Sequence, residues 1–184
     1  MNDEEIPRGI ATLGGASVMV HFDGACQPPK GPGVATFGFV VEGEGLYAEE
    51  YGLATRPYSE HSTNNVAEYV AAIRALEWLR SQGYRGAVTV AGDSQLIIRQ
   101  MNGEYQVRTE HLEAYHEWLQ RLAKEFRSVE WQWVPREENR RADALSKRAL
   151  DEARPTARRL RGADAAPTQD EGENTGDDPD ESGD

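Results

Sequence analysis

The sequence predicts an α/β fold built on a mixed five-stranded sheet: a three-strand antiparallel meander, further parallel strands, and helices on both faces. Two observations predict this fold. Three strand-like stretches succeed one another early in the chain, and after them segments with helical spacing alternate with short apolar stretches. Consecutive strands joined by short turns form antiparallel meanders, whereas alternating helices and strands add parallel strands that the helices cover.

The first three elements are expected to be strands. Residues 17–24, SVMVHFDG, alternate apolar and polar side chains as a half-buried strand does, and we expect this strand to end near Asp23. The next stretch, ACQPPKGPG, is rich in Pro and Gly and predicts a turn or an excursion. Residues 34–43 and 46–54 predict the second and third strands, joined as a hairpin by a Gly-Glu-Gly turn.

The rest of the folded chain is expected to alternate between helices and strands. Thr109 precedes a run of helical spacing and is expected to cap that helix, while Gly103 is expected to close the helix before it. The expected elements are a helix over 65–81, a strand over 86–93, a short helix over 94–103, a helix over 109–126, a strand over 129–135 and a helix over 138–153.

Charge is unevenly distributed along the 184 residues, whose formal net charge is −12. Nine acids and no Lys or Arg lie between Ala163 and Asp184, and without them 23 acids face 20 bases. The net charge therefore does not exclude a nucleic-acid partner. We expect a leader over 1–16, one folded domain over 17–153, and an Arg-rich segment followed by an acidic, disordered tail over 154–184.

Cysteine content and hydropathy limit the class of protein. Cys26 is the single cysteine, which excludes a disulfide framework and a cysteine-based zinc site. No run of about eighteen apolar residues is present, and the acidic N-terminal stretch lacks the apolar segment of a signal peptide. We therefore expect a soluble cytoplasmic protein with no membrane partner.

Four carboxylates fall at the ends or starts of the expected elements: Asp23, Glu68, Asp93 and Asp143. Each has an ordinary interpretation. Asp23 precedes a glycine and suits a turn, and Asp93 lies where a helix N-cap is expected. Glu68 and Asp143 lie near helix starts, where acids are favoured by the helix dipole. Taken one at a time, none of the four requires a catalytic role.

Together, the four carboxylates indicate a metal site. Mixed sheets place ligands at the carboxyl ends of strands and at adjacent helix starts, so these side chains are expected at one edge. Carboxylates gathered there repel one another unless cations lie between them. Magnesium prefers such oxygen ligands. Two ions about 4 Å apart activate a water and stabilise the leaving oxygen in phosphodiester hydrolysis.

Four stretches contain these carboxylates, in the order FDGAC (22–26), TNNVAEY (63–69), GDSQLI (92–97) and NRRADALS (139–146). They resemble the four sequence blocks of ribonuclease H type 1, in that family's order and with suitable spacing. The resemblance covers about residues 17–149. It implies the ribonuclease-H-like fold and an endonuclease that hydrolyses the RNA strand of RNA–DNA hybrids, leaving 3′-hydroxyl and 5′-phosphate ends.

The same resemblance implies the roles of the carboxylates. Asp23 would bridge two Mg²⁺ ions, for which Mn²⁺ can substitute. Glu68 and Asp93 would complete one ion's site, and Asp143 would help to hold the other. A monomer is expected.

Substrate contacts are also implied by the family. Asn64, Asn65 and Gln95 correspond to positions that touch the nucleic acid in its minor groove, and the backbone around Gly24 to Cys26 would face the RNA. Amide side chains suit this role because they donate and accept hydrogen bonds, and hybrids are recognised by groove shape and 2′-hydroxyls.

The sequence departs from the best-known bacterial pattern in two ways. The stretch QMNGEYQVRTEH is short and not basic where that pattern has a basic, tryptophan-containing handle, so affinity is expected from Arg136, Arg140, Arg141 and the arginines of 154–161. The final loop also lacks the usual catalytic histidine. Arg136 stands seven residues before Asp143, which resembles the archaeal-type branch and makes Arg136 a catalytic candidate. That branch is associated with tolerance of double-stranded RNA, a second candidate substrate.

Alternatives remain at this point. Arg136 could be a surface arginine paired with Glu137 or Glu138. A catalytically silent ribonuclease-H-like nucleic-acid-binding module would usually have lost a carboxylate, whereas all four are present. A 3′–5′ exonuclease of the wider superfamily would need a D-x-E pair in its first strand, which the Asp23-Gly24-Ala25 stretch lacks.

Overall fold

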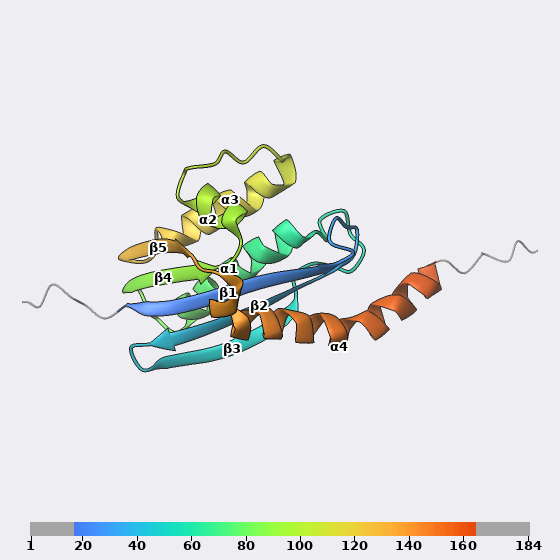
Figure 1. The fold of residues 1–184 in the computed structure, drawn as a ribbon, viewed down its shortest axis with the longest axis horizontal. Coiled ribbons are helices and arrows are strands. Elements are labelled where there is room, and N and C mark those ends of the chain that lie inside the picture. Colours follow the sequence, from blue (N-terminus) through green and yellow to red (C-terminus); the bar gives the residue numbers. More distant parts are fainter. Residues whose placement is uncertain (1–16, 165–184) are drawn as a thin grey trace, which may run out of the picture.

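The structure, a computed structural model, describes residues 17–164 (Figure 1). The predicted leader over 1–16 and the tail beyond residue 164 lie outside the described residues. Five strands form one sheet in the order β3-β2-β1-β4-β5. The strands are β1 (Val18–Gln27), β2 (Val34–Gly43), β3 (Leu46–Leu53), β4 (Ala87–Gly92) and β5 (Ser128–Trp133).

The sheet is mixed, as the sequence predicts. β1, β2 and β3 pair antiparallel as a meander, whereas β4 pairs parallel with both β1 and β5. The β2–β3 turn contains Gly43, Glu44 and Gly45, with φ of 124°, 55° and 76°. Two of these three left-handed positions are glycine, the residue that adopts them without steric cost.

Helices cover both faces of this sheet (Figure 1). They are α1 (Asn64–Ser81), α2 (Gln95–Met101), α3 (Glu110–Ala123) and α4 (Arg140–Asp164), with a 3-10 turn, η1 (Arg136–Glu138). A Cβ added to Gly24 would lie 2.3 Å from the Glu68 nitrogen in α1, and one on Gly38 would lie 2.5 Å from the Ser146 nitrogen in α4. Gly38 pairs with Asp23, the neighbour of Gly24. Since successive strand residues face opposite sides, α1 and α4 cover opposite faces.

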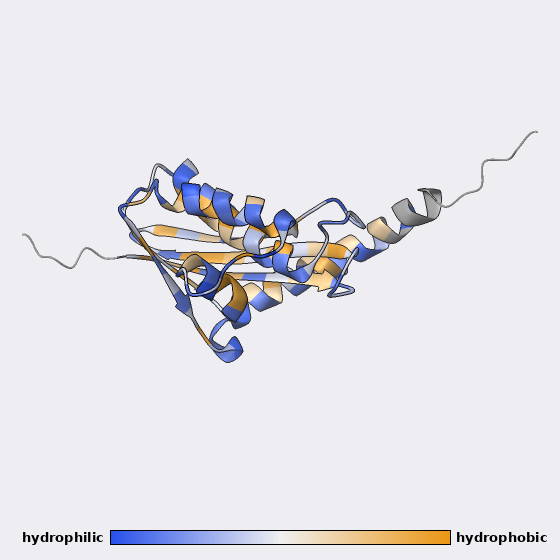
Figure 2. Cartoon of the chain, turned by 90° about the horizontal axis from the view of Figure 1, so that it is seen from above, coloured by the Kyte–Doolittle hydropathy of each residue, from blue (hydrophilic) through white to orange (hydrophobic). Residues whose placement is uncertain are grey.

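The core lies between these layers. Figure 2 shows hydrophobic residues concentrated along the strands, beneath the helices. Tyr69, Leu76 and Leu79 of α1 are fully buried, as are Leu119 and Leu122 of α3, which packs beside α1. This packing holds α1 in place against the sheet, including the N-terminal end of the helix. None of the helices within residues 17–164 has the length and apolarity that a membrane crossing requires.

The predicted end of β1 is wrong. We expected this strand to end near Asp23, but it continues to Gln27 because residues as far as Gln27 pair with β2. Asp23 therefore lies within a strand. The Pro- and Gly-rich turn is correspondingly shorter than expected.

The predicted ends of the last helix are also wrong. The helix begins at Arg140 instead of residue 138, because residues 136–138 form the 3-10 turn. It then continues to Asp164 with Pro155 inside it. Ala149 and Ala157 are both buried, so packing continues past residue 153 and outweighs the tendency of proline to end a helix. The domain boundary at 153 stays a prediction.

The other helix ends differ slightly from expectation. α1 begins at Asn64, one residue early, because the Thr63 hydroxyl accepts a 3.3 Å hydrogen bond from the Val66 nitrogen. α3 ends at Ala123, three residues before the predicted end. Thr109 occupies the N-cap of α3, as predicted, but its side chain makes no cap hydrogen bond.

Candidate active site

The sheet opens where β1 separates from β4. These strands pair only as far as His21 and Ala91, while β1 continues beside β2. Asp23 and Asp93 each lie two residues beyond that last pair, so the parallel register brings both to the opening. Asp93 directly follows β4, which ends at Gly92. This edge is the carboxyl end of a parallel strand pair, where mixed sheets place ligands.

Two helices bring the other carboxylates to the same opening. Glu68 lies in the second turn of α1, and Asp143 lies in the first turn of α4. α1 packs closely against β1 at Gly24, because glycine has no side chain there; an added Cβ would lie 2.3 Å from the Glu68 nitrogen. The carboxylates influence one another's ionisation: Asp93 and Asp143 act on Asp23, and Asp23 and Asp93 act on Glu68. The four predicted carboxylates therefore form one cluster.

Asp23 is the buried centre of the cluster. Its side chain lies on the α4 side of the sheet and is 8% exposed. The Ser146 hydroxyl donates a hydrogen bond to Asp23 Oδ2. Burial raises the pKa of Asp23 to about 6, a rise that the charges of Asp93 and Asp143 increase and the Ser146 hydrogen bond opposes. An ionised Asp23 is therefore costly unless a cation compensates it.

Glu68 is held by two neutral donors. Asn64 Nδ2 donates to Glu68 Oε1 at 3.0 Å, and the Ser94 hydroxyl donates to Oε2 at 2.5 Å. Burial raises the pKa of Glu68 to about 8; the Ser94 bond opposes this rise, and the charges of Asp23 and Asp93 add to it. The hydrogen bonds orient the carboxylate without neutralising it.

Asp93 is positioned through Asn139. Asn139 Nδ2 donates to Asp93 Oδ1 and to the Phe22 carbonyl oxygen, each at 2.9 Å. The Trp133 indole donates to the Asp93 carbonyl oxygen at 3.2 Å. Asn139 is buried just before α4, so one amide joins β1, the end of β4 and the start of α4.

Asp143 is the most strongly compensated carboxylate. Arg136 donates to its Oδ1, and Lys147 Nζ donates to its Oδ2 at 2.7 Å. Burial acts to raise the pKa of Asp143, but the hydrogen bonds from Lys147 and Arg136 outweigh it and hold that pKa below its usual range. The carboxylates of the cluster thus ionise differently. The pKa of Asp143 is lowered, which favours its charged form, whereas those of Asp23 and Glu68 are raised, which favours their protonated forms.

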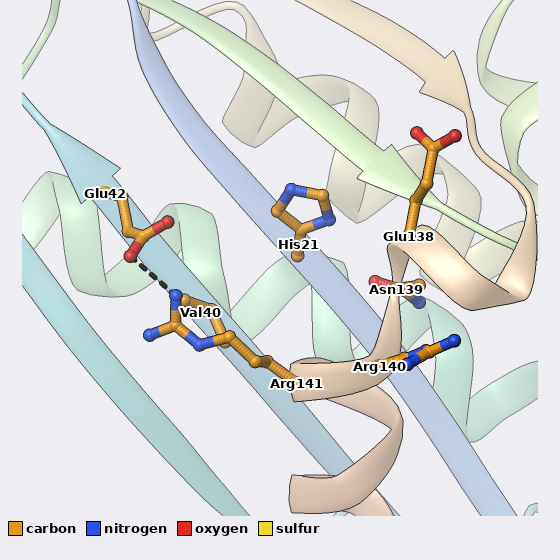
Figure 3. Close-up of a pocket in the computed structure, with 7 residues that line it drawn as sticks. All are labelled: His21, Val40, Glu42, Glu138, Asn139, Arg140 and Arg141. Atoms are coloured by element: carbon orange, nitrogen blue, oxygen red, sulfur yellow. Dashed lines mark hydrogen bonds and ion pairs between the residues drawn. The ribbon is translucent and has the colours of Figure 1, made fainter.

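A cavity of about 290 Å³ borders the cluster at the start of α4 (Figure 3). His21 of β1 and Asn139 line it, with Arg141 and Glu42 paired at 2.6 Å on the opposite side. His21 Nδ1 and Asn139 Oδ1 are buried and make no hydrogen bond among the described residues. The amide of Asn139 therefore donates to Asp93 with its nitrogen, while its oxygen is buried and makes no hydrogen bond among the described residues.

Known proteins match this chain along most of the domain. A family model described as reverse transcriptase-like matches residues 21–149. A bifunctional protein of Mycobacterium tuberculosis is 34% identical over 155 residues, which are 83% of this chain and 39% of that protein. Ribonuclease HI of Halobacterium salinarum is 34% identical over 139 residues, which are 76% of this chain and 67% of that enzyme.

Solved structures agree with these matches. The N-terminal ribonuclease H domain of the M. tuberculosis protein superposes with a TM-score of 0.69 and 32% identity, covering 77% of this chain and 99% of that one. Ribonuclease H1 of H. salinarum has a TM-score of 0.66 and 35% identity, covering 74% and 99%. The chain belongs to the ribonuclease H type 1 family. The family assignment made from the four sequence blocks is confirmed, and so is the fold.

The donor set of the site fits magnesium. Four carboxylates from β1, α1, the end of β4 and α4 provide only oxygen, as Mg²⁺ prefers. Burial and mutual repulsion raise the pKa of Asp23 and Glu68, which is the electrostatic signature of a site that a cation would stabilise. Across residues 17–164, no three His, Cys, Asp or Glu side chains already stand in a closed metal-binding arrangement. Instead, hydrogen bonds donated by neighbouring side chains hold Glu68 and Asp143 in place.

The predicted groove-contacting amides lie beside the carboxylates. Asn64 begins α1, but its amide is bound to Glu68 at 3.0 Å. Asn65 is half-buried next to it, and Gln95 is exposed as the first residue of α2. Contact of these three residues with nucleic acid stays a prediction.

Gly24 and Cys26 lie on β1 beyond Asp23. Gly24 packs directly under α1, which gives it a structural reason to lack a side chain. The Cys26 thiol is buried and donates to the carbonyl oxygens of Pro28 and Ser62, at 3.2 and 3.1 Å. Burial raises the pKa of this thiol, so it stays neutral. Contact of the backbone from Gly24 to Cys26 with RNA stays a prediction.

Sequence reasoning assigned no role to four residues that hold the carboxylates: Ser94, Asn139, Ser146 and Lys147. Their spacing contained a signal. Ser146 and Lys147 follow Asp143 by three and four residues, which is one helical turn, and so face the same side. The contacts with Glu68, Asp93 and Asp23 span 26 to 123 residues, and no local pattern reveals them.

Proposed function

We propose that this protein is a magnesium-dependent endoribonuclease that hydrolyses the RNA strand of RNA–DNA hybrids by two-metal-ion catalysis. The observation that carries the proposal is the cluster of four carboxylates at the opening between β1 and β4, two of them with raised pKa. Family membership supports the same chemistry. A ribonuclease H1 solved in complex with an RNA/DNA hybrid is 34% identical to this chain, with a TM-score of 0.66 over 74% of it.

Asp23 would help to hold both Mg²⁺ ions, since it lies centrally and interacts with both Asp93 and Asp143. Glu68 and Asp93 would complete one ion's site, and Asp143 would hold the other. When bound, the ions activate the attacking water and stabilise the leaving oxygen, which yields 3′-hydroxyl and 5′-phosphate ends. Mn²⁺ can take their place because it accepts the same ligands.

The protein's own residues orient this chemistry. Ser146 on Asp23, Ser94 on Glu68 and Asn139 on Asp93 hold each carboxylate in one orientation. A carboxylate whose rotation is already restricted loses less entropy when it binds an ion. The neutral donors achieve this without competing for the negative charge.

Arg136 would act on the phosphate. Its side chain is 64% exposed and reaches Asp143 from the 3-10 turn. Arginine stays protonated at working pH, so it cannot be a general base, as a histidine can. The guanidinium would hold the scissile phosphate and stabilise the departing product. The alternative pairing with Glu137 or Glu138 is not the one the structure contains.

Substrate selection would come from the edge around α1 and α2. Asn64, Asn65, Gln95 and the backbone from Gly24 to Cys26 border the carboxylates and would contact the minor groove. The chain spans 39% of the length of the mycobacterial relatives it matches, so the cellular substrates of a longer protein are outside this proposal.

The test is a substrate panel in Mg²⁺: one sequence as RNA–DNA hybrid, double-stranded RNA and double-stranded DNA, each strand end-labelled. We expect cleavage within the RNA strand of the hybrid, products with 3′-hydroxyl ends, and intact DNA. Slower cleavage of double-stranded RNA would support the archaeal-type assignment. Hybrid binding without cleavage in Mg²⁺ or Mn²⁺ would establish the silent binding module instead.

A further inference from the structure

Two histidines lie together outside the carboxylate cluster. The ring centroids of His61 and His111 are 5.8 Å apart, with the ring planes inclined by 57°. His61 belongs to the loop between β3 and α1, and His111 lies in the first turn of α3. Glu60 and Glu110 line the same cavity, of about 370 Å³. Two imidazoles and two carboxylates from distant parts of the chain therefore converge on one space.

The spacing of the rings suits one shared metal ion. A zinc–imidazole bond is about 2.0–2.1 Å long, so two imidazoles on one ion hold their ring centroids roughly 5–6 Å apart. The observed 5.8 Å lies within that range. Imidazole with carboxylate is a ligand set for Zn²⁺ and neighbouring transition metals, whereas Mg²⁺ prefers oxygen alone.

The loop that contains His61 is held in one conformation. The hydroxyl of its neighbour Ser62 is hydrogen-bonded to the Thr55 hydroxyl at 2.7 Å, the Ser59 hydroxyl at 3.0 Å and the Arg56 carbonyl oxygen at 2.8 Å. Ser62 is fully buried. The backbone at His61 is thus fixed before any ligand arrives, which lowers the entropy cost of binding.

The carboxylates are free to complete the ligand set. Glu60 is 88% exposed, with Oε1 at 3.5 Å from His61 Nε2, and Glu110 is exposed at the start of α3. His61 Nδ1 is buried, so the nitrogen that would bind the ion is Nε2, on the side of Glu60. An exposed glutamate changes rotamer at little cost, so either one can become a third ligand beside the imidazoles.

We propose that His61 and His111, with the carboxylate of Glu60 or Glu110, bind one transition-metal dication such as Zn²⁺, at a site separate from the catalytic carboxylates. The ion would join the β3–α1 loop to the start of α3. Because that loop leads directly into α1, which contains Glu68, metal binding would stabilise the element that positions one catalytic carboxylate. A ligand that binds only the folded chain raises its melting temperature.

The experiment uses Co²⁺, a spectroscopic substitute for Zn²⁺, added to the metal-free full chain. Nitrogen ligation in a four- or five-coordinate site gives strong visible absorption, whereas an all-oxygen six-coordinate site gives little. We expect a saturable visible band at one ion per chain and a concentration-dependent rise in melting temperature. His111→Gln should weaken binding at least tenfold, and so should His61→Gln.

Controls separate this site from the catalytic one. His116→Gln removes a histidine from the same helix, and Asp23→Asn removes the centre of the carboxylate cluster; both should keep the visible band and its affinity. Absence of the band, unchanged affinity in His111→Gln, or an equal loss in His116→Gln would overturn the proposal. Since the band does not depend on cleavage, this result is independent of the nuclease assay.

Discussion

Replacing Glu68 by glutamine should stabilise the metal-free protein, and increasingly so as pH rises. The side chain would keep its shape and both hydrogen bonds, because a glutamine oxygen accepts from Asn64 and its amide donates to the Ser94 hydroxyl oxygen. What is lost is a carboxyl group whose pKa is raised from 4.5 to about 8, first by burial and then by the charges of Asp23 and Asp93.

The size of the effect follows from proton linkage. Between pH 4.5 and about 8 the folded state holds a proton on Glu68 that the unfolded state has lost. Stability therefore falls as pH rises through this window. The shift corresponds to a loss on the order of 4 kcal/mol by pH 8. Asp23, with its pKa raised to about 6, contributes with the same sign in both proteins.

The assay is urea unfolding of both proteins in EDTA at pH 5, 6, 7 and 8, with Glu113→Gln on α3 as an exposed-carboxylate control. The two unfolding free energies should converge toward pH 5 and separate by about 4 kcal/mol at pH 8. Millimolar Mg²⁺ should narrow the gap, because the ion binds only the folded, ionised parent. A gap independent of pH, or a variant less stable than the parent at pH 8, would refute the reasoning.

Three further predictions follow from the site. Asp143→Asn should abolish hybrid cleavage while circular dichroism shows a folded protein; near-normal turnover in Mg²⁺ would contradict the two-metal assignment. Arg136→Ala should slow single-turnover cleavage about tenfold, roughly 1.4 kcal/mol, and Arg136→Lys should recover part of the rate; an alanine variant as fast as the parent at saturating substrate would leave Arg136 a surface residue. Deleting residues 165–184, which contain eight acids, should leave the cleavage rate intact. It should tighten hybrid binding at 50 mM salt but not at 300 mM, because salt screens the repulsion between acids and phosphates. Loss of folding would show that the tail is structural.

Local patterns in the sequence were enough to predict the sheet and most helices. Alternation marked β1, the Gly-Glu-Gly turn marked the β2–β3 hairpin, and helical spacing marked α1. Errors arose where tertiary contacts outweighed local propensity. β1 continues past Asp23 because its residues pair with β2 as far as Gln27. α4 continues past Pro155, and Ala157 within this extension is buried.

The carboxylates of the site were predictable, and their environment was not. Asp93 follows directly from the end of β4, and the parallel register brings Asp23, which lies within β1, to the same opening. The raised pKa of Asp23 depends on burial that exists only in three dimensions, and the hydrogen bond that opposes the rise comes from Ser146, 123 residues away. Likewise, the sequence gives the seven-residue separation between Arg136 and Asp143. That Arg136 pairs with Asp143, and not with Glu137 or Glu138, depends on the 3-10 turn.

In the proposed mechanism, ions held by the four carboxylates would contact the scissile phosphate. The most direct measurement is cleavage of a hybrid with one nonbridging phosphate oxygen replaced by sulfur at a mapped cleavage site, in Mg²⁺ and in Mn²⁺. Sulfur binds Mg²⁺ poorly and Mn²⁺ better, since Mn²⁺ is the softer ion. We expect one sulfur diastereomer to be cut at least tenfold more slowly in Mg²⁺ and to recover in Mn²⁺. Equal rates for oxygen and both sulfur diastereomers in both metals, or cleavage that persists in EDTA, would contradict the account.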